Sequence, residues 1–135
     1  MPLSNTLLLE YWNIDGAYYK NSNICKLDDV EIINCLNKND IVCLVETHCN
    51  EEQKPEIDGF ATPISNVRPK TPGAPYNSGG ILIYIKTNIR KGITVLPQTN
   101  SEYRWLKLNS SFFKTPNDIY LCVVYISNGS FAEKK

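Results

Sequence analysis

Apolar and polar positions in the first half of the chain predict two strands with a helix between them. The apolar run at 6–12 predicts a buried strand, and the residues at 13–16 have turn chemistry. Apolar residues recur at helical spacing over 27–36, which predicts an amphipathic helix. The run at 40–46 predicts a second buried strand, so the chain opens as strand, helix and strand.

The second half of the pattern is mainly that of β-structure. A short strand is predicted at 59–62, whereas the proline-rich segment 63–79 predicts a long surface loop without regular structure. Further strands are predicted at 81–86, 93–96, 103–108 and 119–126. The short connections between them favour antiparallel pairing.

Composition adds the broad class of protein. A chain of 135 residues with 42% hydrophobic and 21% charged residues is expected to fold as one globular domain. Five cysteines, two of them inside apolar strand patterns, favour a reduced protein. The sequence has no signal peptide and no apolar stretch of membrane-spanning length, so we expect an intracellular protein, in cytoplasm or nucleus, without a membrane partner.

The formal net charge is zero, but the charges are unevenly placed. Residues 1–60 carry four lysines against eleven acids, and residues 61–114 carry eight Lys and Arg against one acid. The basic segment could bind a polyanion, or the two halves could simply offset each other on the folded surface. Charge alone leaves both alternatives open.

The candidate chemistry lies where the two predicted strands end. Glu46 closes the apolar run of the second strand, and Asn13 ends the first. Sites in α/β folds are built at such sheet rims. Alternatively, Glu46 is an ordinary surface acid at a strand end and Asn13 a turn residue.

Four short motifs, taken in order, are more specific than any one alone. They are a strand ending at Trp12-Asn13, a strand ending at Glu46-Thr47-His48, Ser78-Gly79-Gly80 opening a strand that closes with Lys86, and a late strand at 120–125. The order and spacing resemble those of the endonuclease/exonuclease/phosphatase superfamily. The Glu-Thr-His form is most similar to the endonuclease of LINE-type retrotransposon polyproteins, which accompanies a reverse transcriptase.

This resemblance implies an α/β (α+β) four-layer sandwich, with two sheets face to face and helices outside. It also implies hydrolysis of phosphodiester bonds in DNA with Mg²⁺ or Mn²⁺ as cofactor. By the same resemblance, Glu46 is a metal ligand, and Asn13 lies beside it to hold the metal, the carboxylate or a phosphate oxygen. Tyr125 matches a tyrosine whose hydroxyl points at the scissile phosphate, which completes the implied catalytic set of Asn13, Glu46 and Tyr125.

The chain also departs from the family pattern. Ser127 stands where a proline is usual, and neither Asp-x-Asn nor Ser-Asp-His follows Tyr125. We therefore expect residues 1–135 to be a single, C-terminally truncated domain with little catalysis and with the second sheet largely missing. That loss would leave Val123 and Leu82 without a packing partner, and the uncovered sheet could drive self-association.

Other assignments remain as alternatives. His48 is interpreted as structural or as lining the cleft rim, because the family's catalytic histidine comes from the missing segment. A zinc site at Cys43 and Cys49 is disfavoured, since no second ligand pair exists at suitable spacing. The competing functions are hydrolysis of abasic DNA, hydrolysis of a phospholipid or inositol phosphate, and a non-enzymatic remnant that binds nucleic acid or protein through 61–114.

Overall fold

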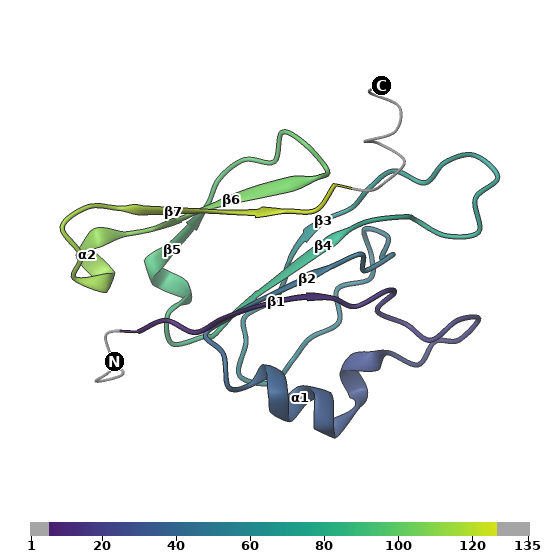
Figure 1. Cartoon of the computed structure of the whole chain (residues 1–135), viewed down its shortest axis with the longest axis horizontal. Coiled ribbons are helices and arrows are strands. Elements are labelled where there is room, and N and C mark those ends of the chain that lie inside the picture. Colours follow the sequence, from purple (N-terminus) through teal and green to yellow (C-terminus); the bar gives the residue numbers. More distant parts are fainter. Residues whose placement is uncertain (1–5, 127–135) are drawn as a thin grey trace.

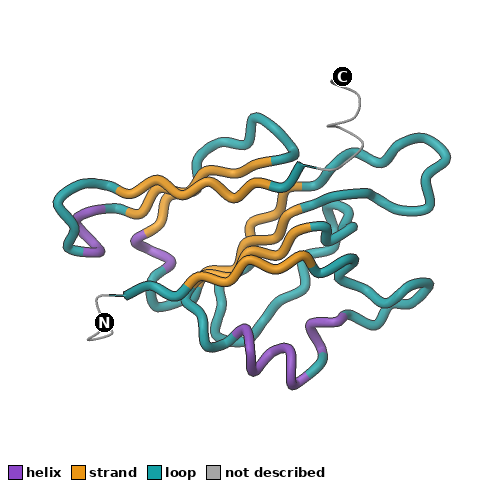
Figure 2. The backbone as a smooth tube through the Cα atoms, viewed as in Figure 1, coloured by secondary structure: helices purple, strands orange, loops and turns teal. Residues whose placement is uncertain are grey.

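The computed structural model describes residues 6–126 and shows two β-sheets packed face to face, with α1 outside the first sheet (Figures 1 and 2). The first sheet has the strand order β1-β2-β4-β3, and the second has the order β5-β6-β7. The strands are β1 (Leu9–Asn13), β2 (Ile41–Val45), β3 (Ile64–Asn66), β4 (Ile81–Ile85), β5 (Ile93–Val95), β6 (Tyr103–Leu108) and β7 (Ile119–Val124). This is the mixed α/β sandwich that the motifs imply. Ser127 lies outside the described residues.

The opening strand, helix and strand form in the predicted order, but β1 is an edge strand with mostly exposed side chains and not the buried strand that the apolar run predicts. β1 and β2 pair in parallel, with Asn13 opposite Val45. A 3₁₀ turn, η1 (Lys26–Asp28), precedes the helix α1 (Val30–Leu36). The helix starts later than the apolar spacing predicts because Asp29 caps it: its side chain accepts hydrogen bonds from two backbone N–H groups of the first turn.

The continuous apolar runs of β2 and β4 are explained by burial on both sheet faces. Val42 and Leu44 pack on the side of α1, with Leu82 of β4. Ile41, with its alternate neighbours along β2, faces the second sheet and packs against Leu106. Because side chains alternate across a strand, a sheet covered on both faces needs apolar residues at every position.

The expectation that Val123 and Leu82 lack packing partners is wrong. Val123 is 3% exposed and packs between the two sheets, and Leu82 is fully buried on the opposite face of the first sheet. Within residues 6–126 the second sheet has three strands, which cover β2 and β4 on the inner face of the first sheet. The second sheet is nevertheless partial, because Leu9 and Tyr11 on the same face of β1 stay 49% and 50% exposed.

The proline-rich segment contains a strand that the sequence does not predict. β3 forms at Ile64–Asn66, directly after Pro63, and pairs antiparallel with β4. Proline is tolerated there because β3 is an edge strand and Pro63 precedes its first residue. The strand predicted at 59–62 is reduced to a single bridge between Phe60 and Lys86.

The antiparallel pairing of the second half is confirmed in β5, β6 and β7. Two short elements were not predicted, the 3₁₀ turn η2 (Arg90–Gly92) and the helix α2 (Ser110–Phe113). No helix within residues 6–126 is both long and apolar enough to cross a membrane.

A buried amide ties the two sheets together. Asn66 of β3 is 2% exposed, and its amide donates to the backbone carbonyl of Tyr103 in β6 at 2.7 Å. The guanidinium of Arg104 donates to the Asn66 carbonyl oxygen at 2.8 Å. Arg104, one of the residues of the basic segment, is half-buried and holds the Asn66 side chain from β6.

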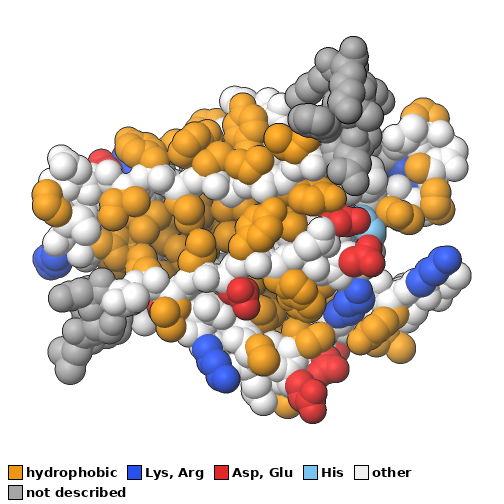
Figure 3. Space-filling view, in the orientation of Figure 1, with side chains coloured by type: hydrophobic (Ala, Val, Ile, Leu, Met, Phe, Trp, Pro, Cys, Tyr) orange, Lys and Arg blue, Asp and Glu red, His pale blue; other side chains and the backbone are white. Residues whose placement is uncertain are grey.

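β1 and β7 are edge strands on the same side of the sandwich, and the Tyr11 hydroxyl donates to the Val124 carbonyl across it at 2.9 Å. Hydrophobic side chains gather along this side (Figure 3), with Tyr11, Tyr120 and Val124 all 40% exposed or more. Exposed edges and apolar surface favour association. Self-association through this side stays a prediction.

Val124→Lys tests that prediction, because a lysine on an edge strand opposes pairing with another chain. We expect the sedimentation coefficient of the unchanged chain to rise with concentration and the variant to associate about tenfold more weakly. Val30→Lys is the matched control, since Val30 is 69% exposed on α1. Equal association of all three proteins would contradict the prediction.

Candidate functional site

The ends of β1 and β2 bring the candidate residues to one rim of the first sheet. Their parallel pairing continues beyond the strands, where Ile14 N–H donates to the Val45 carbonyl at 3.0 Å and Gly16 N–H to the Glu46 carbonyl at 2.7 Å. Asn13 and Glu46 are therefore held side by side by backbone hydrogen bonds.

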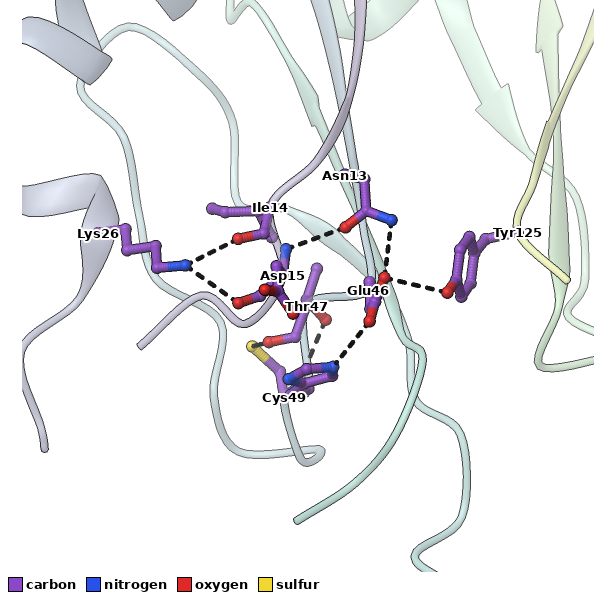
Figure 4. A network of polar contacts seen from close by, with 9 residues as sticks. Asn13, Ile14, Asp15, Lys26, Glu46, Thr47, Cys49 and Tyr125 are labelled. Carbon is purple, nitrogen blue, oxygen red and sulfur yellow. Dashed lines mark hydrogen bonds and ion pairs between the residues drawn. The ribbon is translucent and has the colours of Figure 1, made fainter. Parts of the chain in front are cut away.

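The Glu46 carboxylate receives two hydrogen bonds on one oxygen. The Asn13 amide donates to Oε2 at 2.7 Å, and the Tyr125 hydroxyl donates to the same atom at 3.1 Å. Tyr125 directly follows β7, so it reaches Glu46 from the second sheet (Figure 4). The structure thus brings together all three residues that the sequence singles out.

The orientation of the Asn13 side chain defines its role. Its carbonyl oxygen accepts from the Asp15 backbone N–H at 3.0 Å, which turns the amide nitrogen toward Glu46. Asn13 therefore positions the carboxylate. The Oδ1 atom of Asn13, which would bind a metal ion, already accepts the Asp15 hydrogen bond with one of its two lone pairs. Direct ligation of a metal by Asn13 stays a prediction.

These contacts change the acidity of both partners. The Asn13 hydrogen bond, then the Tyr125 hydrogen bond and the electrostatic attraction of His48, hold the pKa of Glu46 below its ordinary value of 4.5. Burial, and then the hydrogen bond to Glu46, raises the pKa of the Tyr125 hydroxyl. At neutral pH the site therefore presents an ionised carboxylate and a protonated phenol.

Asn13→Ala should raise the pKa of Glu46 more than Tyr125→Phe does, because the Asn13 hydrogen bond is the largest cause of the lowering. The side-chain carboxyl ¹³C shift of Glu46, followed against pH in metal-free buffer, measures it. A lowered pKa stabilises the fold above the unfolded-state value and loses this effect as pH falls through the folded-state value. The stabilisation is therefore complete above about pH 4.5 and is lost below it, and Asn13→Ala should make this loss smaller. Equal shifts in the two variants would contradict this ranking.

A cluster of possible metal ligands surrounds Glu46. One donor atom each from Asp15, Glu46 and His48 lie within 4.8 Å of one another, and His48 Nε2 is 3.6 Å from Glu46 Oε1. Two carboxylates suit a hard divalent cation such as Mg²⁺, and an added imidazole is compatible with Mn²⁺. The donor set therefore fits the metal that the family resemblance implies.

Asp15 was missed as a candidate because its sequence context is that of a turn. The available signal was its place two residues after Asn13, at the end of a strand that pairs in parallel with the Glu46 strand. The sequence predicts that His48 is structural or lines the cleft rim. In the structure its imidazole lies beside the Glu46 carboxylate.

All three cluster residues have left-handed backbone conformations. The φ angles are +49° for Asp15, +55° for Glu46 and +57° for His48. Such residues each cost roughly 1–2 kcal/mol and tend to occur at functional sites. Backbone hydrogen bonds hold the segment, since Thr47 and His48 donate to the Gly80 and Gly79 carbonyls at 3.3 and 2.9 Å.

The cysteines near the site lack the features of a nucleophile or a metal ligand. Burial raises the pKa of the Cys43 thiol to about 12 and that of Cys49 to about 11. Both side chains are at most 2% exposed and therefore stay protonated. The chemistry of the site rests on oxygen and imidazole donors.

The site residues fall within a match to a known protein family. The model of the Endonuclease/Exonuclease/phosphatase family matches residues 11–131, a range that includes Asn13, Glu46 and Tyr125. No curated protein matches the chain.

Proposed function

We propose a function from one premise: the chain belongs to the Endonuclease/Exonuclease/phosphatase family. In this proposal the rim site serves metal-dependent hydrolysis of phosphodiester bonds in DNA, as in the retrotransposon type of endonuclease. The observation that carries the proposal is the Glu46 carboxylate, held by Asn13 from one sheet and by Tyr125 from the other, beside Asp15 and His48.

Each residue has a chemical task in this proposal. Glu46 and Asp15 would hold Mg²⁺, with His48 at the edge of the ligand set. When bound, the ion supplies Lewis-acid polarisation of a phosphoryl oxygen. Asn13 keeps the carboxylate in one orientation, and the protonated Tyr125 hydroxyl is placed to donate a hydrogen bond to charge that develops on the phosphate.

Few residues of this chain are suited to act as the general base that activates the nucleophile. His48 is the only histidine of the sequence, and it lies against Glu46 within the ligand cluster. The sequence after Tyr125 contains no Asp-x-Asn. Because a positioned base typically contributes about 10²–10⁴-fold to a rate, we expect only slow hydrolysis by these 135 residues.

Nicking of supercoiled plasmid in Mg²⁺, with protein in excess over DNA, tests the proposed function. We expect slow nicking that EDTA and Glu46→Ala both abolish. Glu56→Ala is the matched control, because Glu56 is an exposed acid outside the ligand cluster.

The possible results separate the alternatives. Rapid nicking that Glu46→Ala abolishes would keep the site and overturn the expectation of slow hydrolysis. Nicking unchanged in Glu46→Ala would overturn the site. Faster hydrolysis of an abasic duplex or of an inositol phosphate than of plasmid would assign a different substrate of the same chemistry.

A further inference from the structure

A cavity of about 800 Å³ opens beside the ligand cluster. Asp15 and His48 belong both to the cluster and to the cavity wall. The remaining wall includes Tyr19 and Tyr76 together with the lysines Lys20 and Lys70. A group bound in this cavity would therefore lie next to a phosphate held at Glu46.

Tyr76 offers an aromatic surface to the cavity. Its ring lies 4.4 Å from the His48 ring, centroid to centroid, with the two planes at 32°. The residue is nevertheless 50% exposed, so His48 supports the ring without enclosing it. Stacking on His48 joins Tyr76 to the segment that carries Glu46.

The proline-rich loop presents Tyr76 in a restrained conformation. Pro75 directly precedes Tyr76, and the proline ring fixes the φ angle of Pro75 itself. The Asn77 side chain donates to the Arg68 carbonyl at 3.1 Å, and Ala74 N–H donates to the Thr71 carbonyl at 2.9 Å. A loop ordered in this way loses less entropy when a ligand stacks on it.

A second aromatic ring and several cations complete the wall. Tyr19 is 46% exposed, and the Lys26 ammonium lies 5.9 Å from the centre of its ring. Lys26 is anchored by the carbonyls of Ile14 and Asp15 at 2.9 and 3.0 Å. Lys20 and Lys70 are exposed and add positive charge at the cavity.

We propose that this cavity is a nucleobase subsite, which stacks one unpaired base of a DNA strand on Tyr76 while the neighbouring phosphate lies at Glu46. The proposal rests on the proposed function and refines its substrate to DNA with an unstacked base. Exposed aromatic rings with interspersed cations are the features that bind single strands, since every base has a face to stack. An inositol phosphate or a lipid headgroup would bind the lysines through its phosphates but has no aromatic ring to stack on the tyrosines.

Equilibrium binding of a fluorescein-labelled oligothymidylate, measured by anisotropy in EDTA, tests the subsite without hydrolysis. Tyr76→Ala should weaken binding about 5- to 100-fold, and Tyr76→Phe should retain it, because the ring does the stacking. A strand of the same length made of abasic residues carries the same phosphates without bases. On that strand Tyr76→Ala should change the affinity by less than about twofold.

Tyr120→Ala is the matched control, because Tyr120 is 57% exposed on β7 and does not line the cavity. Equal losses on thymidylate and abasic strands, or equal losses in the Tyr76 and Tyr120 variants, would overturn the subsite. Base-dependent binding without Glu46-dependent nicking would keep the subsite and reject the proposed hydrolysis. The reverse result would reject the subsite alone.

Discussion

Glu46→Gln is expected to weaken Mn²⁺ binding by about 100-fold or more, because loss of a mere supporting contact already costs roughly 10–100-fold at metal sites. Glutamine keeps the shape of the side chain and removes the charge that a hard cation requires. The group changed is the carboxylate that Asn13 and Tyr125 orient. Titration of free Mn²⁺ by electron paramagnetic resonance measures the affinity.

Three further variants make this result specific. Glu56→Gln removes an exposed acid outside the ligand cluster and should leave the affinity unchanged. Asp15→Asn should weaken binding, since Asp15 supplies the second carboxylate of the cluster. Asn13→Ala should give a loss of about tenfold or more if Asn13 acts only by orienting Glu46. Binding by Glu46→Gln that equals binding by the unchanged chain would reject the site.

Gly80→Ala is expected to lower the free energy of unfolding by about 3–4 kcal/mol, through backbone strain and steric overlap together. Gly80 has a φ of +96°, and a Cβ there would lie 2.5 Å from Thr47 Oγ1. Thr47 is 1% exposed, so packed neighbours surround the side chain that would have to shift. Urea unfolding followed by tryptophan fluorescence measures the change.

Gly73→Ala separates the two causes. Gly73 has a similar φ of +84°, but a Cβ there would meet nothing within 4 Å. This control should lose only the backbone contribution, about 1–2 kcal/mol. Gly80→Ala should also weaken Mn²⁺ binding, because the Gly80 carbonyl accepts from Thr47 in the Glu46 segment. Equal destabilisation by the two variants would show that Thr47 does yield to the added carbon.

Much of the framework follows from local pattern. The apolar run of β2 predicts a buried strand, and β2 is buried on both faces. The opening strand, helix and strand predict parallel pairing, which places Asn13 beside Glu46 at one rim. Hydrophobic alternation and helix capping act over a few residues, so the sequence alone carries this information.

Other features depend on contacts between distant segments. β3 has weak strand character and forms because the edge of β4 offers it hydrogen-bond partners. The burial of Val123 depends on how the second sheet lies over the first, and no local pattern specifies that. The resemblance to a known family singled out Tyr125, whereas its 3.1 Å contact with Glu46 spans 79 residues of sequence.

The sequence by itself determined which residue types stand at the strand ends: an amide at the end of β1 and a carboxylate directly after β2. Only the tertiary structure decided which atoms meet there, that Asn13 turns its nitrogen to Glu46, that Asp15 and His48 join the carboxylate, and that Tyr76 stacks on His48. The physical reason is that strand propensity acts locally. A ligand cluster depends on left-handed turns and sheet packing, which long-range contacts stabilise.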